Sequence, residues 1–132
     1  VKEGRLVGNG VGQQDRVGAA KLAIFRADDA AKNMQAMKVN FDGGRFTPEA
    51  GGKPKNLPSL ADTQASLEGS VAYSDSFFPF PDAPEVLINR GIKTIFSTSG
   101  SVNDEKIIEL CKNRGVELIL IPDSEARGFY QH

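Results

Sequence analysis

The sequence predicts an α/β fold with a mainly parallel sheet. Between residues 70 and 122, strand-like and helix-like segments alternate, which is the pattern of strands joined by crossover helices. The segment 116–122, VELILIP, is apolar almost throughout, as strands covered on both faces usually are. A chain of 132 residues is long enough for one sizeable core. We therefore expect a single domain over residues 1–132.

The first half of the chain predicts a glycine-rich turn followed by a long helix. Residues 5–7 indicate the end of a strand, and GNGVGQQ at 8–14 forms the turn. Asp15 precedes the helix, where its carboxylate favours the helix dipole and caps free N–H groups. Apolar side chains then recur at spacings of three and four, which is typical of one helix face that packs on a sheet. They are Val17, Ala20, Ile24, Ala27, Ala31 and Met34.

The second half divides into three strands and two helices. Pro81 suits the first turn of a helix, and Gly91 and Gly115 follow helices as C-terminal glycines do. Between residues 39 and 69 the periodicity fades into Gly, Pro, Lys and Ser, which predicts a long surface loop within the domain. The expected strands are 70–73, 92–98 and 116–122, and the expected helices are 81–89 and 103–113.

Composition argues against several classes of function. The formal net charge is −1 and the pI is near 5.8, without the basic cluster that a nucleic-acid surface needs. No apolar run is long enough to span a membrane, so we expect a soluble, cytoplasmic protein. One cysteine, Cys111, and one histidine, His132, exclude an internal disulfide and a Cys/His zinc site. The chain starts at Val1 directly in strand-like sequence, which suggests a piece of a longer protein.

The segment GNGVGQQDR at 8–16 is the first of three motifs that could hold a ligand. Its glycines let the backbone approach a ligand closely, and the helix that follows offers free N–H groups. A tight turn between strand and helix explains the same residues, and the spacing departs from the dinucleotide-binding fingerprint. Arg16 opposes the helix dipole and should therefore have another role.

The second and third motifs are SDSFFPFPD at 74–82 and STSGS at 97–101. The first is either a buried aromatic corner or the wall of a pocket. In a pocket its rings would stack on a planar heterocycle, and Asp82 would accept hydrogen bonds from the heterocycle's N–H edge. STSGS follows a strand, so it should lie at the carboxyl edge of the sheet, where ligands bind in such folds. Ordinary helix-cap chemistry explains it equally well.

Together the motifs GxGxGQQxRV, SDSFFPF.D, SGSxxD and a C-terminal R..F..H resemble the C-terminal part of the aminoimidazole carboxamide ribonucleotide (AICAR) formyltransferase family. In many members this enzyme is joined to IMP cyclohydrolase. The resemblance runs from Gly4 to His132 and is weakest between 39 and 69. It implies a cytidine-deaminase-like, three-layer α/β sandwich. It also implies the C-terminal transformylase subdomain of a cytoplasmic homodimer in de novo purine biosynthesis.

The resemblance further implies a role for each matching residue. The family transfers a formyl group from 10-formyltetrahydrofolate to the 5-amino group of AICAR. Some members bind potassium near the acid that Asp75 matches. The implied nucleotide contacts are Gly12, Gln13, Arg16, Ser99, Gly100 and Arg127. The implied folate contacts are Phe77, Pro79, Phe80 and Asp82.

The family's general acid/base machinery, an adjacent Lys-His pair, does not occur in this sequence. Formyl transfer needs a base near neutrality, and His132 at the chain end is a poor candidate. We therefore expect no catalytic residue here and no activity of this chain alone. Activity would require the N-terminal remainder of the same protein. The alternative hypothesis is a stand-alone ligand-binding or regulatory module that keeps the fold without the reaction.

Overall fold

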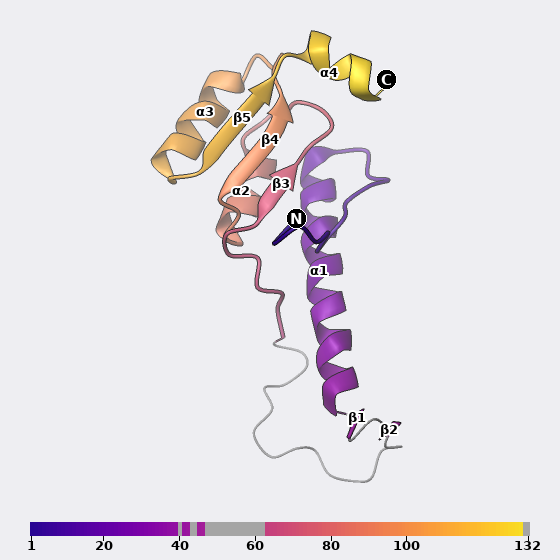
Figure 1. Cartoon of the computed structure of the whole chain (residues 1–132). Coiled ribbons are helices and arrows are strands. Elements are labelled where there is room, and N and C mark those ends of the chain that lie inside the picture. Colours follow the sequence, from indigo (N-terminus) through magenta and orange to yellow (C-terminus); the bar gives the residue numbers. More distant parts are fainter. Residues whose placement is uncertain (40, 43–44, 47–62, 131–132) are drawn as a thin grey trace.

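The computed structural model describes residues 1–39, 41–42, 45–46 and 63–130. Figure 1 shows a long first helix beside a small sheet with its own helices. The α/β class predicted from the sequence is confirmed. The elements are α1 (Arg16–Val39), β1 (Phe41–Asp42), β2 (Arg45–Phe46), β3 (Val71–Tyr73), α2 (Asp82–Asn89), β4 (Thr94–Thr98), α3 (Asp104–Asn113), β5 (Glu117–Ile121) and α4 (Asp123–Tyr130).

The sheet that organises the second half has the strand order β3-β4-β5, and both pairings are parallel. α2 joins β3 to β4, and α3 joins β4 to β5. The parallel sheet is thus confirmed, and each element predicted there lies within two residues of its expected bounds. Because all three strands run the same way, the segments that follow them gather at one edge of the sheet.

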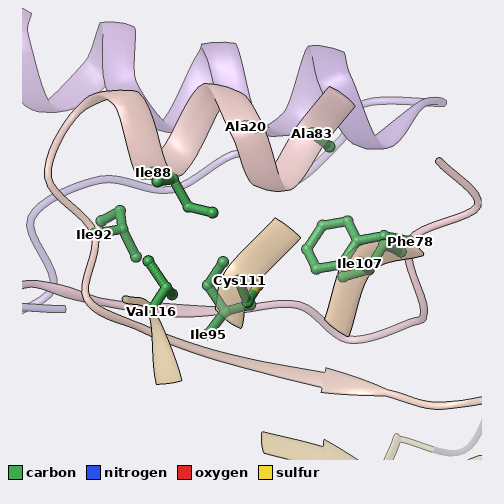
Figure 2. Packing of buried hydrophobic residues seen from close by; sticks show 9 residues of the cluster. All are labelled: Ala20, Phe78, Ala83, Ile88, Ile92, Ile95, Ile107, Cys111 and Val116. Atoms are coloured by element: carbon green, nitrogen blue, oxygen red, sulfur yellow. The ribbon is translucent and has the colours of Figure 1, made fainter. Parts of the chain in front are cut away.

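The hydrophobic core lies between this sheet and the helices α2 and α3 (Figure 2). Ile95, the second residue of the central strand β4, is fully buried there. Phe96 and its neighbour Tyr73 on β3 lie on the opposite face, where Tyr73 is 52% exposed. The three-layer, cytidine-deaminase-like sandwich therefore stays a prediction. The buried cluster comprises Ala20, Phe78, Ala83, Ile88, Ile92, Ile95, Ile107, Cys111 and Val116.

The helix predicted after the glycine turn is confirmed as α1, but its expected packing is partly wrong. α1 packs mainly against α2 rather than on the sheet. Ala20 and Ala27 are buried, whereas Met34 is exposed. The 24 residues of α1 span about 36 Å and the eight of α2 about 12 Å, so α2 cannot cover the whole apolar face.

Two further expectations need correction. The strand expected at residues 5–7 is absent: Arg5 makes an isolated bridge with Lys2 across a tight turn. The C-terminal tail contains a helix, α4, that the pattern did not predict. Within the loop expected at 39–69, β1 and β2 form a short antiparallel pair, and residues 47–62 lie outside the described ones.

No described helix combines the length and apolarity needed to cross a membrane.

Candidate functional site at the carboxyl edge of the sheet

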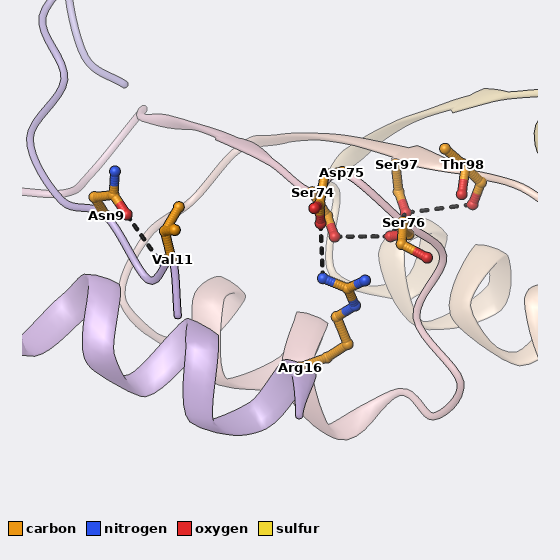
Figure 3. A network of polar contacts seen from close by, with 8 residues as sticks. All are labelled: Asn9, Val11, Arg16, Ser74, Asp75, Ser76, Ser97 and Thr98. Atoms are coloured by element: carbon orange, nitrogen blue, oxygen red, sulfur yellow. Dashed lines mark hydrogen bonds and ion pairs between the residues drawn. The ribbon is translucent and has the colours of Figure 1, made fainter. Parts of the chain in front are cut away.

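The start of α1 joins the glycine turn to the aromatic motif (Figure 3). Asp15 caps the helix as predicted, because its Oδ1 accepts a hydrogen bond of 2.6 Å from the Gly18 N–H. Arg16 Nη1 donates to Asp75 Oδ1 at 2.7 Å. This ion pair supplies the other role expected for an arginine in the first helical turn, since the carboxylate offsets the unfavourable interaction with the dipole.

The glycines at 8 and 10 pack against α1. A Cβ atom on Gly8 would lie 2.2 Å from the carbonyl oxygen of Ala23, and one on Gly10 would lie 2.0 Å from that of Ala19. The helix also satisfies a polar group of the turn, because Arg26 Nη1 on α1 donates to the Asn9 carbonyl at 2.8 Å. These contacts favour close packing on a helix, rather than close approach to a ligand, as the reason for both glycines.

The segment SDSFFPFPD is an elbow in which one ring points inward and two do not. Phe78 is 4% exposed and belongs to the core, whereas Phe80 is 58% exposed and Phe77 is half-buried. Buried Ser97 on β4 donates through its hydroxyl to the Ser76 carbonyl at 3.1 Å. The elbow is therefore a structural corner anchored by Phe78 that leaves the other two rings accessible to a ligand.

The Ser-Gly-Ser turn has fewer free donors than its composition suggests. The Ser99 N–H donates to the Ile121 carbonyl at 2.9 Å. The N–H groups of Gly100 and Ser101 donate to the carboxylate of Asp104 at 2.8 and 3.3 Å. That carboxylate would also repel a phosphate group. The hydroxyl of Ser99 is accordingly the group through which this turn is best suited to bind a ligand.

The ends of β3, β4 and β5 converge on Gly100. A Cβ atom on this residue would lie 3.8 Å both from Phe77 Cδ1 and from Asp123 Cβ. Asn103 adds a second link, because its Nδ2 donates to the Pro79 carbonyl at 2.6 Å. Sequence reasoning missed Asp123 and Asn103. The position of Asp123 directly after a strand could have suggested it, whereas nothing local points from Asn103 to Pro79.

The remaining predicted residues are spread around this edge. Gly12 and Gln13 are exposed just before α1. Asp82 is exposed at the start of α2, where its Oδ1 accepts from the Ala83 N–H at 2.9 Å. Arg127 belongs to α4, but its side chain lies outside the described residues, as does His132. The nucleotide and folate roles of all these residues stay predictions.

The potassium role of Asp75 fits poorly with the observed geometry. One oxygen of its carboxylate is held by the Arg16 guanidinium at 2.7 Å, and a metal cation beside it would be repelled by that charge. Among the described residues no group of three His, Cys, Asp or Glu side chains is arranged to hold a metal ion.

Cys111 does not supply a nucleophile to this edge. It is buried in α3 within the core, and burial raises the pKa of its thiol. The thiol is therefore protonated at neutral pH and inert, and the side chain serves to fill the core.

A shallow hollow of about 420 Å³ lies elsewhere, at the end of the sheet where β4 begins. It is lined by residues 64–68 and 88–91 and by Lys93, and contains none of the predicted site residues. Its wall includes Arg90, whose guanidinium is already engaged by Asp28 at 2.7 Å. The carboxyl edge, in contrast, carries the accessible rings, the Ser99 hydroxyl and Arg16. The candidate site is therefore this edge and not the hollow.

Comparison with known proteins shows a clear likeness to a purine biosynthesis protein. No family model matches the chain. The chain is 34% identical over 116 residues to the bifunctional purine biosynthesis protein PurH of Cutibacterium acnes. The aligned region is 88% of this chain and 16% of that relative. The chain is therefore a partial homologue of a purine biosynthesis protein and spans only a small part of its length.

Proposed function

We propose that this chain is the C-terminal subdomain of an AICAR formyltransferase, which transfers a formyl group from 10-formyltetrahydrofolate to AICAR. The observation that carries the proposal is the meeting of three family-like motifs at one edge of the sheet, through the Arg16–Asp75 ion pair and the proximity of Phe77 to the Gly100 backbone. The partial likeness to PurH supports it. The enzyme would be cytoplasmic and homodimeric and would include the N-terminal remainder of the same protein.

Each proposed contact has a chemical reason. The Arg16 side chain is about one third exposed and its partner Asp75 about one half, so an anionic or carbonyl group of the nucleotide could replace that carboxylate. Phe77 and Phe80 offer ring faces to the pterin. Asp82, exposed beside them, can accept hydrogen bonds from the pterin N–H edge. Arg127 would bind the ribonucleotide phosphate.

Ligand titration of the chain by NMR tests the proposal. AICAR should shift the amide resonances around Arg16 and Ser99, and a reduced folate should shift those around Phe77 and Asp82. Arg16→Ala should weaken AICAR binding about tenfold or more, because a hydrogen bond to a charged group is lost. Arg114→Ala is the matched control, since Arg114 is exposed at the far end of α3 and contacts Asn89. Unchanged AICAR affinity in Arg16→Ala would contradict the nucleotide role.

The purified 132-residue chain should show no formyl transfer. Attack by a weakly nucleophilic aromatic amine on a formamide requires proton removal by a base near neutrality and donors for the oxyanion. At the candidate site the polar side chains described are carboxylates, hydroxyls, amides and Arg16, none of which is a base near neutrality, and the sequence has no Lys-His pair. The measurement is production of formyl-AICAR at saturating substrates. Turnover by the isolated chain would refute the assignment of the base to another part of the protein.

A further inference from the structure

Asn103 stands at the N-terminal cap position of α3, yet its side chain does not cap the helix. No capping hydrogen bond is made by it, although asparagine is among the residues preferred there for that purpose. Instead its Nδ2 donates to the Pro79 carbonyl across 24 positions in sequence, at 2.6 Å. The amide therefore joins the turn after β4 to the elbow after β3.

The part of the elbow that Asn103 contacts has few groups of its own that could fix its position. Pro79 and Pro81 have no N–H to donate, and the Phe80 ring is 58% exposed. The inner part of the elbow is anchored differently, by buried Phe78 and by the Ser97 bond to Ser76. The bond from Asn103 thus acts on the segment that the core does not fix.

We propose that Asn103 is a positioning residue that holds Pro79 and Phe80 against the turn at 99–101. It thereby sets the separation between the two loops that face a ligand. The consequence of this inference, which rests on the proposed function, is that the elbow is preorganised for the flat ring system of a reduced folate. Preorganisation improves affinity because the entropy cost of ordering the elbow is already included in folding and is not added to binding.

The test compares Asn103→Ala with Asn103→Gln, which keeps the amide donor, and with Asn113→Ala, an exposed control at the other end of α3. Backbone ¹⁵N relaxation of the ligand-free chain measures the mobility of Phe80, and NMR titration measures the affinities for a reduced folate and for AICAR. Asn103→Ala should lower the backbone order parameter of Phe80 and weaken folate binding about three- to tenfold, the range expected for one hydrogen bond. AICAR affinity should change less than twofold, and Asn103→Gln should recover part of the loss.

A merely structural role would give a different pattern. The Asn103 side chain does not cap α3, so its loss should not destabilise that helix. If Asn103→Ala nevertheless acted by lowering helix stability, it would weaken the binding of both ligands alike, and Asn113→Ala would have a similar effect. An unchanged order parameter at Phe80 overturns the inference, as does a folate affinity that is the same in Asn103→Ala as in a wild type that binds folate. If the wild type binds no reduced folate but Asn103→Ala still lowers the order parameter at Phe80, the proposed folate site fails and positioning of the elbow by Asn103 is supported.

Discussion

Gly10→Ala is expected to lower the free energy of unfolding by about 3 kcal/mol or more, because overpacking against a fixed backbone exceeds the usual cost of a tight side-chain fit. The new Cβ would lie 2.0 Å from the Ala19 carbonyl oxygen and 2.7 Å from the carbonyl carbon. A side chain could turn away from such a clash, but a helix backbone cannot. Either residues 8–12 leave α1, or α1 shifts and weakens its packing on α2. Urea unfolding followed by far-ultraviolet circular dichroism measures the loss.

Gly12→Ala separates this steric effect from backbone conformation. Gly12 has φ +95°, and a Cβ there would meet nothing within 4 Å. Its replacement should cost only the left-handed conformational penalty, about 1–2 kcal/mol. If Gly10→Ala costs no more than Gly12→Ala, residues 8–10 yield easily and close packing on α1 is not why glycine stands at position 10.

Gly10 also shows which property of the turn could be predicted from the sequence and which could not. The glycines predicted a turn correctly because their backbone freedom is a local property. Whether a ligand or a helix occupies the space beside Gly10 depends on a segment that begins six residues later and returns along it. Arg16 was more informative, because its conflict with the helix dipole is visible in the sequence and indicates a missing partner. The identity of that partner, Asp75, is set by the tertiary fold.

The same distinction applies to the sheet and its loops. The strands β3, β4 and β5 and the helices α2 and α3 were predictable because their apolar patterns and the glycines that follow the two helices are local signals. The exposure of Met34 was not, since it depends on how short α2 is relative to α1. At the candidate site, the position of Ser99 and Gly100 at the carboxyl edge follows from strand direction. The hydrogen bonds from the Gly100 and Ser101 N–H groups to Asp104 could not be predicted in this way, because they depend on the geometry of the folded turn.

Asp28 and Arg90 form the other contact with a large expected effect. Arg90 Nη2 and Nη1 donate to the two carboxylate oxygens of Asp28 at 2.7 and 2.8 Å, and the Ala65 N–H donates to the same carboxylate at 2.8 Å. The side chains are 22% and 17% exposed for Arg90 and Asp28. The pair therefore ties α1 to the end of α2 and to the segment before β3, with little screening by solvent.

The charge state of this pair makes its contribution depend on pH. The hydrogen bond from Arg90 lowers the pKa of Asp28, with the Ala65 N–H acting in the same direction against the opposing effect of burial. A carboxyl group whose folded pKa lies below its unfolded value stabilises the fold above the unfolded value, near 4, and loses that effect as pH falls through the folded pKa. Stability from this pair should thus be constant from pH 5 to 8.

Asp28→Asn should consequently lower the free energy of unfolding by about 2 kcal/mol at pH 7, the scale of hydrogen bonds to a charged group. The deficit relative to wild type should shrink below pH 4, because Asp28 then takes up a proton in the unfolded chain before it does so in the folded one. Urea unfolding at several pH values between 3 and 7 measures it. Glu68→Gln is the matched control, because the Glu68–Lys93 pair is exposed and 3.7 Å apart and should contribute less than about 0.5 kcal/mol. A deficit that persists undiminished to pH 3 would show that the Asp28 carboxylate is not stabilised by Arg90 in the folded protein.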